Sequence, residues 1–463
     1  MAELHELTAF ELSAAYAARR LSPKQVTQAL IEHIARWEPH ISALWWHEPE
    51  QAMAQADAAE RRWARGAPLS ALDGVPVTLK ENIATQGVSV PLGCAATELR
   101  PAAEDAPPAA RLREAGAVFI GKTTMPDWGM LSSGLSSFHK LARNPWNVAR
   151  NPGGSSSGAG AAAAAGYGPI HLGTDIGGSI RLPANWCGVV GFKPSLGRVP
   201  IKPPYAGRVA GPMTRSVTDA AMAMSVLSKP DWRDAMSLPA QTIDWMALER
   251  DARGLRIGLW LDAGWGDALQ PEVRAAVESA AAAFGAAGAT VVPIPPFSTR
   301  QMIEGLDRFW RMRSWLDYRA LPPERQAKVL PYIRQWIASG EHLSGEEVFT
   351  GYSQMGALRD AAVAALQGLD VLLAPVSPDV AFAAEQASPR NDPERPFEHV
   401  AYTVAFNFSE QPAVSVPASM SSDGLPIGLQ IVGHRHDDLG VLRVARLWEQ
   451  LRGPLPAGPT LPR

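Results

Sequence analysis

Cysteine is scarce in this chain: Cys94 and Cys187 are the only two among 463 residues. So few cysteines exclude a disulfide scaffold and a cysteine-rich zinc site. Long apolar runs are absent too, since no stretch approaches the roughly 18 uninterrupted apolar residues that a membrane-spanning helix needs. The N-terminal segment carries acidic side chains from Glu3 onward and lacks the apolar run of a secretory signal. We therefore expect a soluble, cytoplasmic protein without a membrane partner.

The chain also has no large excess of positive or of negative residues. Lysine and arginine together number 43, and aspartate and glutamate 46, which gives a formal net charge of −3. Proteins that bind nucleic acids normally carry a basic surface, so we expect no nucleic-acid partner. Hydrophobic residues make up 46% of the chain and charged residues 19%, a composition typical of folded proteins with a large core.

Apolar residues recur at helix spacing in some segments and at strand spacing in others. Within residues 7–36, Ser22-Pro23 separates two predicted helices, because serine caps a helix and proline suits its first turn. A strand, a helix and a strand over 255–294 predict a βαβ unit, and 300–350 is predicted to be helical and aromatic. Strands are expected at 75–79, 117–121, 255–261, 290–294, 370–374 and 413–417, and those at 75–79, 370–374 and 413–417 are expected to be buried.

Two short motifs fit catalytic patterns by chance. Residues 116–123 match the phosphate-loop pattern, but their four middle residues form an apolar strand where an open turn is required. Ser137 to Lys140 match the S-x-x-K element of penicillin-binding enzymes, yet the S-D-N and K-T-G strings of those enzymes occur nowhere in the chain. We assign neither a nucleotide nor a β-lactam site.

A third motif leaves an alternative open. Residues 154–158 match the G-x-S-x-G elbow of α/β-hydrolases, which would make the protein an esterase with Ser156 as nucleophile. A late histidine would complete that site, and His399, His434 and His436 are the candidates. The segment before Ser156 is Pro-Gly-Gly-Ser, which is not the strand that should lead into an elbow.

Three residues taken together indicate a function more strongly than the elbow motif does. Lys80 ends a predicted buried strand, Ser155 lies in one Gly/Ser loop, and Ser179 closes a second one. The strings GGSSSGAG and LGTDIGGSIRLPANWCGVVGFKPSLGRV, with GPMTRSVTD and DVLLAPVSP further along, resemble the amidase signature family of serine hydrolases. This resemblance implies one α/β/α domain over 1–463, with a mixed β-sheet between layers of helices. The signature core would span about 70–220, a variable helical aromatic region about 225–365, and a return to the core about 366–450.

The resemblance implies a proton relay for cleaving amides. Lys80 is the base, Ser155 is the bridging serine held in a cis peptide, and Ser179 is the nucleophile that becomes acylated. Ser156 would help to hold Lys80. A lysine has a pKa of about 10.4 in water, so this role needs a drop of roughly 3 units, which burial can supply because it disfavours the ammonium form.

The loop at 176–179 predicts an oxyanion hole. Glycines let backbone amides turn toward one point, so we expect the amides of Ile176, Gly177, Gly178 and Ser179 to bind the developing oxyanion. Asp175 and Arg181 flank this loop, and we interpret them as a structural brace.

Substrate preference is predicted from the lining residues and the middle region. By resemblance, Met130 and Ser132 line the acyl side of the pocket. The aromatic residues Trp310, Trp315, Tyr318 and Trp336 are interpreted as core rather than pocket, yet their region is where substrate choice is expected. The aromatic middle region favours a small or aryl amide, as in an aryl acylamidase, or a carbamate, as in a urethanase.

A second branch of the family stays open. The glutamyl-tRNA amidotransferases contain an A subunit with similar loops, but this chain departs from it at 203–215, where we expect that branch to carry a Ser-Leu-Asp-Gln-like element. We therefore predict a stand-alone hydrolase, a monomer or homodimer that uses no metal or organic cofactor.

Overall fold

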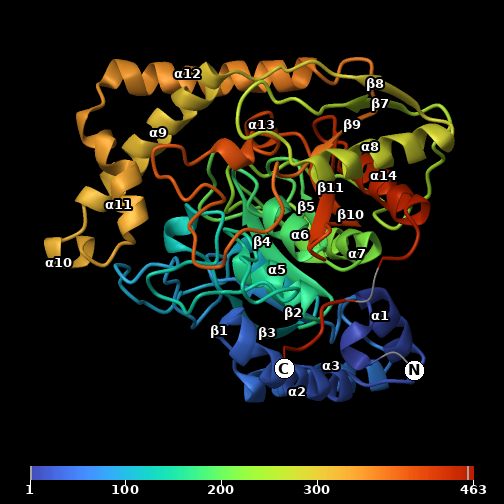
Figure 1. Cartoon of the computed structure of the whole chain (residues 1–463). Coiled ribbons are helices and arrows are strands. Elements are labelled where there is room, and N and C mark those ends of the chain that lie inside the picture. The colour runs from blue at the N-terminus through green and yellow to red at the C-terminus, as the bar shows by residue number, and fades with distance from the viewer. Residues whose placement is uncertain (1–2, 456–457, 463) are drawn as a thin grey trace.

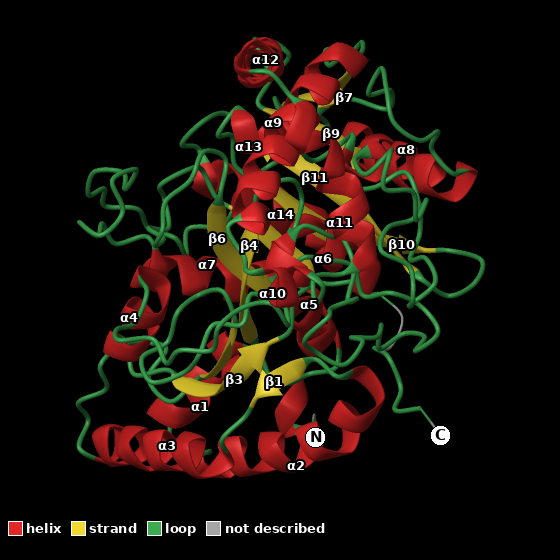
Figure 2. Ribbon diagram, turned by 90° about the vertical axis from the view of Figure 1, so that its left-hand side faces the viewer, coloured by secondary structure: helices red, strands yellow, loops and turns green. Residues whose placement is uncertain are grey.

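The computed structural model describes residues 3–455 and 458–462. One mixed sheet of 11 strands runs through the molecule in the order β1-β3-β2-β4-β6-β5-β10-β11-β9-β7-β8 (Figures 1 and 2). The strands are β1 (Leu44–Trp46), β2 (Pro76–Lys80), β3 (Val118–Thr123), β4 (Ile170–Asp175), β5 (Val190–Lys193), β6 (Val209–Thr214), β7 (Arg256–Leu259), β8 (Thr290–Pro293), β9 (Val371–Pro375), β10 (Ala413–Met420) and β11 (Pro426–Gly433).

Helices surround this sheet. The α-helices are α1 (Ala9–Ala17), α2 (Pro23–Ile41), α3 (Pro49–Ala64), α4 (Pro107–Glu114), α5 (Ser157–Ala164), α6 (Arg181–Cys187), α7 (Val217–Leu227), α8 (Pro271–Ala286), α9 (Arg300–Arg319), α10 (Pro323–Gln326), α11 (Pro331–Ile337), α12 (Gly345–Ala364), α13 (Ala405–Phe408) and α14 (Asp438–Leu451). Short 3₁₀ helices are η1 (Leu4–Glu6), η2 (Asp127–Gly129), η3 (Ala338–His342) and η4 (Glu398–Val400). No helix of residues 3–455 or 458–462 combines the length and apolar character needed to cross a bilayer.

The helices cover both faces of the sheet, so the predicted α/β/α architecture is confirmed. Helices α1, α7, α8 and α14 bury their apolar residues in one large core on one face. Helix α6 contacts β5, β10 and β11 from the other face, and α5 packs beside it. On that second face, α9, α11 and α12, which lie at the upper left and along the top of Figure 1, contribute to a separate aromatic core.

Most predicted elements are present. Ser22 caps α2 with Pro23 at its first position, as predicted. Strands β7 and β8 pair in parallel with α8 between them, which confirms the βαβ unit. The alanine-rich segment after Ser156 is helix α5, and all but the last of its residues are buried, because glycine and alanine allow close packing.

The alternation of side chains along β2 determines the side of the sheet on which Lys80 lies. Successive side chains of a strand point to opposite faces, and Val77 and Leu79 of β2 belong to the large core. Lys80 therefore points the other way, toward the face that α5 covers. Strands β2 and β4 are parallel neighbours, so Lys80 and Asp175 end at the same edge of the sheet. Ligands of such sheets bind at the carboxyl ends of the strands.

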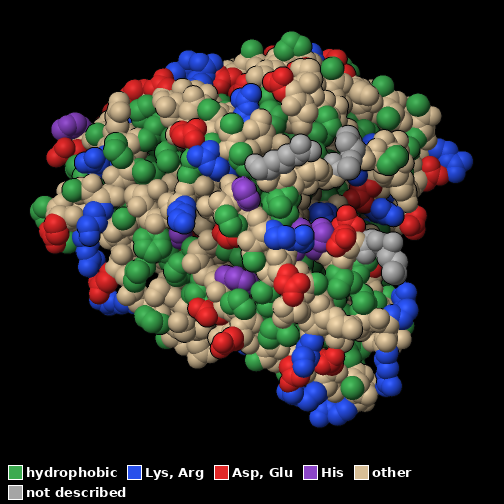
Figure 3. All heavy atoms as spheres, turned by 60° about the horizontal axis from the view of Figure 1, so that its bottom comes forward, with side chains coloured by type: hydrophobic (Ala, Val, Ile, Leu, Met, Phe, Trp, Pro, Cys, Tyr) green, Lys and Arg blue, Asp and Glu red, His purple; other side chains and the backbone are tan. Residues whose placement is uncertain are grey.

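Charged side chains of both signs are distributed over the surface. On the face shown in Figure 3, lysines and arginines are interspersed with acidic side chains, so that face carries no large patch of one sign.

Candidate active site

Lys80 lies fully buried at the end of β2 and contacts two serines. Its Nζ donates to Ser155 Oγ at 2.8 Å and to Ser156 Oγ at 3.1 Å. Burial lowers the pKa of Lys80 well below its usual value, and the nearby charge of Arg208 lowers it further, while Asp175 and Glu81 act in the opposite direction. The structure thus brings together the predicted base and both serines of the first loop.

The two serines occupy the turn that leads into α5. The Gly154–Ser155 peptide is cis, as the resemblance implies. Ser156 Oγ donates to the Thr174 carbonyl at 3.1 Å and accepts from the Thr174 amide at 3.2 Å, so β4 fixes its position. The backbone N–H of Ser156 donates to the carbonyl oxygen of Ser179 at 3.2 Å, which joins the first loop to the second.

Asp175 and Arg181 brace the loop that carries Ser179. The Arg181 Nη2 lies 2.9 Å from Asp175 Oδ1, and both side chains are fully buried. Asp175 also accepts from the backbone N–H groups of Gly178 at 2.8 Å and Ile180 at 3.0 Å. Burial by itself would raise the pKa of Asp175, but Arg181 and these hydrogen bonds hold it well below its usual range.

The same contacts correct one part of the predicted oxyanion hole. The Gly178 N–H already donates to Asp175, so we place Gly178 in the brace and not among the oxyanion donors. Gly178 has a φ of +131°, and a Cβ there would lie 2.6 Å from Thr403 Oγ1, which explains the need for glycine. Within the described residues, the backbone N–H groups of Ile176, Gly177 and Ser179 donate no hydrogen bond to another protein group. These three amides are left as candidate oxyanion donors.

Arg181 connects the loop to the rest of the second face. Its Nη1 donates to the Thr403 carbonyl at 2.9 Å and to Gln430 Oε1 at 2.8 Å, and its Nη2 donates to Asn407 Oδ1 at 2.6 Å. Residues far apart in the sequence therefore hold the Ser179 loop through one buried guanidinium.

The geometry contradicts the esterase alternative. The side chain of Ser156 bonds to Lys80 and Thr174, where the elbow mechanism requires a histidine. His434 Nε2 bonds to the Leu369 carbonyl at 2.6 Å, and His399 is buried against Trp186. His436 donates its backbone N–H to Ser195 Oγ at 3.0 Å. The Ser156 hydroxyl therefore has a lysine, and no histidine, as its basic partner in the described part of the chain.

The two chance motifs have structural roles. Residues 118–123 form β3, and Lys122 is buried with its ammonium on the Ile83 carbonyl and Thr85 Oγ1. Burial lowers the pKa of Lys122 to about 7, yet this lysine contacts no serine of the site. Ser137 Oγ donates to Asp127 at 2.6 Å, and Lys140 is exposed.

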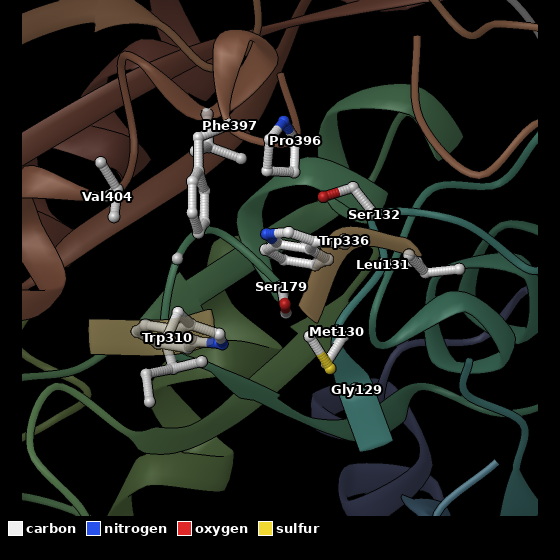
Figure 4. A pocket seen from close by; sticks show the side chains of 13 residues that line it. Gly129, Met130, Leu131, Ser132, Ser179, Trp310, Trp336, Pro396, Phe397 and Val404 are labelled. Atoms are coloured by element: carbon white, nitrogen blue, oxygen red, sulfur yellow. The ribbon is translucent and has the colours of Figure 1, made fainter. Parts of the chain in front are cut away.

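An apolar pocket opens on Ser179. Figure 4 shows the Ser179 hydroxyl between Trp310, Trp336 and Met130, with Phe397 on a further wall. Met130 and Ser132 both line this pocket. The lining comprises Gly129, Met130, Leu131, Ser132, Ile176, Gly177, Ser179, Trp310, Trp336, Pro396, Phe397, Val400 and Val404.

The aromatic residues need one correction. Trp310 and Trp336 are predicted to be core rather than pocket, but they belong to both, since each is buried and each lines the pocket. Trp315 and Tyr318 pack against a small core that includes Leu131 and line neither pocket that contains Ser179. Periodicity cannot distinguish a helix face that packs on protein from one that packs on a substrate.

A second, wider pocket also reaches Ser179. Its wall includes Ser155 and a set of polar residues that the sequence did not predict: Asn82, Tyr205, Arg208, Arg313 and Asp317. The sequence contains a signal for two of them, Tyr205 and Arg208, because both lie in 203–215, where the chain differs from the amidotransferase A subunits.

Comparison with known proteins identifies the family. A family model described as Amidase matches residues 25–442. This chain belongs to the amidase family. The amidase is 32% identical over 461 residues to an acylamidase of Rhodococcus erythropolis, and the match covers 97% of this chain and 96% of that protein. It is 34% identical over 505 residues to the A subunit of the glutamyl-tRNA(Gln) amidotransferase of Anaeromyxobacter sp. (strain K), covering 99% and 98%.

Solved structures agree with this assignment. A bacterial aryl acylamidase of the amidase signature family superposes with a TM-score of 0.89 at 30% identity, covering 97% of each chain. The structure of 6-aminohexanoate cyclic dimer hydrolase gives a TM-score of 0.87 at 28% identity, covering 100% of each. The amidase therefore has the fold of this family, and its activity is the hydrolysis of C–N bonds in amides.

Proposed function

We propose that the protein is a stand-alone serine amidohydrolase that acts through Lys80, Ser155 and Ser179 on non-peptide amides. The observation that carries this proposal is the position of Lys80, buried and bonded to both serines of the first loop while its pKa is lowered. A neutral lysine amine can accept a proton, whereas an ordinary lysine is already protonated near neutral pH.

The proposed reaction begins with a proton relay. Neutral Lys80 accepts the Ser155 proton, Ser155 accepts the Ser179 proton, and Ser179 Oγ attacks the amide carbonyl carbon. The carbonyl π electrons move onto oxygen, and the amides of Ile176, Gly177 and Ser179 stabilise that negative charge. Ser155 then passes its proton to the amide nitrogen and takes back the proton held by Lys80, the C–N bond breaks, and the amine departs while the acyl group stays on Ser179. Water, activated through the same relay, hydrolyses this ester.

The proposed substrates are small or aryl amides, together with carbamates and esters that share an attackable carbonyl. The aromatic wall of Trp310, Trp336 and Phe397 supports an apolar or aryl group beside Ser179, because aromatic faces pack well on flat apolar groups. The likeness to proteins described as acylamidases supports the same class. Activity on carbamates would make this protein a urethanase as well.

The second candidate is an amidotransferase A subunit, which the identity of 34% to such proteins favours. The two functions differ in what the isolated chain does. A stand-alone hydrolase, as monomer or homodimer in the cytoplasm, turns over amides without a partner chain or cofactor, whereas the amidotransferase chain is one component of an assembly.

Intact-protein mass spectrometry after treatment with a fluorophosphonate probe tests the mechanism. We expect one label on the wild type, none on Ser179→Ala, retained labelling on Ser156→Ala, and strongly slowed labelling on Lys80→Ala. Circular dichroism of each variant controls for folding. Labelling that survives in Ser179→Ala would contradict the assignment of the nucleophile.

A further inference from the structure

Ser179 opens onto two pockets of different chemistry, and Ser155 lines only one of them. The apolar pocket with Trp310 and Trp336 includes Ser179 but not Ser155. The wide pocket includes both Ser155 and Ser179. In the relay described above, on which this inference rests, Ser155 delivers the proton to the leaving nitrogen. A proton donor must lie within hydrogen-bond reach of its acceptor, so the leaving amine extends into the wide pocket.

The acyl half of the substrate then occupies the apolar pocket. The carbonyl carbon is bonded to Ser179 in the intermediate, and its two substituents point to different sides. With the amine on the side of Ser155, the acyl chain lies between Trp310, Trp336 and Phe397. In this orientation the acyl half of the substrate contacts apolar side chains, and the amine half lies among polar and charged ones.

Arg208 is the distinctive group on the amine side. It lies just before β6 and lines the wide pocket together with Ser155 and Ser179. In the described part of the chain its guanidinium makes one hydrogen bond, from Nη1 to the Pro203 carbonyl at 3.2 Å, and no carboxylate lies within 4.0 Å of it. Its positive charge contributes to the lowered pKa of Lys80. Burial and the charge of Arg313 lower the pKa of Arg208 itself to about 10.

In the described part of the chain, none of the neighbouring charged groups forms an ion pair with Arg208. Arg313 of α9 lies on the same wall, stacked 4.8 Å from the ring centroid of Tyr205 and 5.5 Å from that of Trp310. Asp175 is bonded to Arg181, and Lys202 at the mouth pairs with Glu104 at 2.6 Å. Asp317 also lines the pocket, one helical turn beyond Arg313. A partly buried guanidinium with free N–H donors fits a carboxylate, which it can bind through two parallel hydrogen bonds.

We propose that the amine half of the preferred substrate carries a carboxylate that Arg208 binds, with Arg313 adding to the positive field. The substrates are then N-acylated amino carboxylic acids with an apolar acyl group, and the products are an apolar acid and an amino acid or aminobenzoate. Arg208 acts as a specificity-determining residue for the anionic end, while Ser179 carries the chemistry.

A matched pair of anilides tests this proposal. N-phenylacetyl-4-aminobenzoate and its methyl ester share the scissile amide and differ in one negative charge, and liquid chromatography measures the release of each aromatic amine. We expect kcat/KM to favour the carboxylate by about 10- to 100-fold, the range for a charged hydrogen-bonded pair. Arg208→Gln should remove most of this preference, chiefly through KM, and Arg208→Lys should restore part of it. Lys202→Gln, at the mouth of the same pocket but paired with Glu104, should keep the preference.

Because Arg208 also influences the pKa of Lys80, the ratio of the two substrates is compared on the high-pH plateau of each variant. Equal kcat/KM for the two substrates in the wild type, or an unchanged ratio in Arg208→Gln, would overturn the proposal.

A binding readout separates this proposal from the proposed function. The rate of fluorophosphonate labelling of Ser179 is measured with 4-aminobenzoate or its methyl ester present. We expect the carboxylate to protect Ser179 in the wild type and not in Arg208→Gln. Labelling of Ser179 without selective protection would reject the carboxylate site and leave the relay intact. Absence of labelling at Ser179 would reject the relay, and with it the assignment of the amine side.

Discussion

Lys80, the proposed base, differs from another buried lysine of the chain in its hydrogen-bond partners. Both Lys80 and Lys122 are fully buried, and burial lowers the pKa of each. Only Lys80 contacts serine hydroxyls that lead toward Ser179, whereas Lys122 bonds to Ile83 and Thr85. Burial favours the neutral form of a lysine, and the groups it contacts determine whether the neutral amine can take part in proton transfer.

The activity should depend on pH through Lys80. The relay needs the neutral amine, so kcat/KM rises with pH and reaches a plateau above the pKa of Lys80. Burial and the charge of Arg208 lower that pKa, so we expect the plateau to begin well below pH 10.5. Arg208→Gln removes a repelling positive charge and should move the midpoint to higher pH. Stopped assays of amide cleavage across a pH series measure both midpoints.

Removing the amine should abolish the pH dependence together with the rate. Lys80→Ala should lower kcat by about 100- to 10,000-fold, the usual contribution of a general base. Lys122→Met is the matched control, since it removes another buried lysine that contacts no serine of the site. Folded Lys122→Met protein with a displaced midpoint would contradict the assignment of the titration to Lys80.

The Asp175–Arg181 pair should contribute to stability in a pH-dependent way. Removing one partner of a buried pair leaves the other charge unpaired, so Arg181→Met should lower the free energy of unfolding by about 3–5 kcal/mol. The folded-state pKa of Asp175 lies below its ordinary value of 3.8, so the contribution is complete above that pH and declines as pH falls below it. Urea titrations at pH 7 and near pH 3 should therefore differ less for Arg181→Met than for the wild type.

At the scale of elements, α5 determines how the first serine loop meets the sheet. The helix begins directly after Ser156, and its glycines allow backbone to approach backbone. A Cβ on Gly158 would lie 2.5 Å from the Thr124 nitrogen and closer still to the Ala43 carbonyl. The alanine and glycine content of this segment is thus a packing requirement that also positions Ser155 and Ser156.

Two glycine-to-alanine changes in helices should have opposite effects. Gly158→Ala in α5 forces backbone to move, and overpacking costs about 1–3 kcal/mol, so we expect a lower melting temperature and less active protein. Gly356→Ala in α12 adds a methyl group to an exposed helix position with nothing within 4 Å, and should stabilise the protein by about 0.5–1 kcal/mol. Thermal unfolding measures both. A Gly158→Ala protein as stable as the wild type would refute the packing argument.

At the scale of the whole molecule, one sheet brings three distant segments to one edge. The first contributes Lys80 and the two serine loops, the second contributes Trp310 and Trp336 from α9 and α11, and the third contributes Phe397. Because residues of all three segments line the pocket beside Ser179, the chain itself supplies a candidate active site together with the pocket next to it.

The isolated chain should therefore hydrolyse amides without partners. We expect turnover of an anilide and an aryl carbamate by the purified protein, with glutamine reacting much more slowly. A chelator should leave these rates unchanged, because the proposed relay uses only side chains and backbone amides. Turnover of glutamine alone would favour the amidotransferase function, and loss of activity with the chelator would contradict the relay.

Local signals along the chain were enough to predict the family, the α/β class, six of the 11 strands, several helices, and the three residues of the proposed relay. These signals are apolar periodicity, the Ser22-Pro23 cap, and two Gly/Ser loops in long characteristic strings. Only the folded structure reveals which groups face the substrate. It engages the Gly178 amide with Asp175, places Trp310 and Trp336 in the pocket wall as well as the core, and puts Arg208 in the wall of a pocket that also contains Ser155 and Ser179. Such facts depend on the direction in which a side chain or amide points once distant segments have packed together, and spacing along one chain carries no information about that direction.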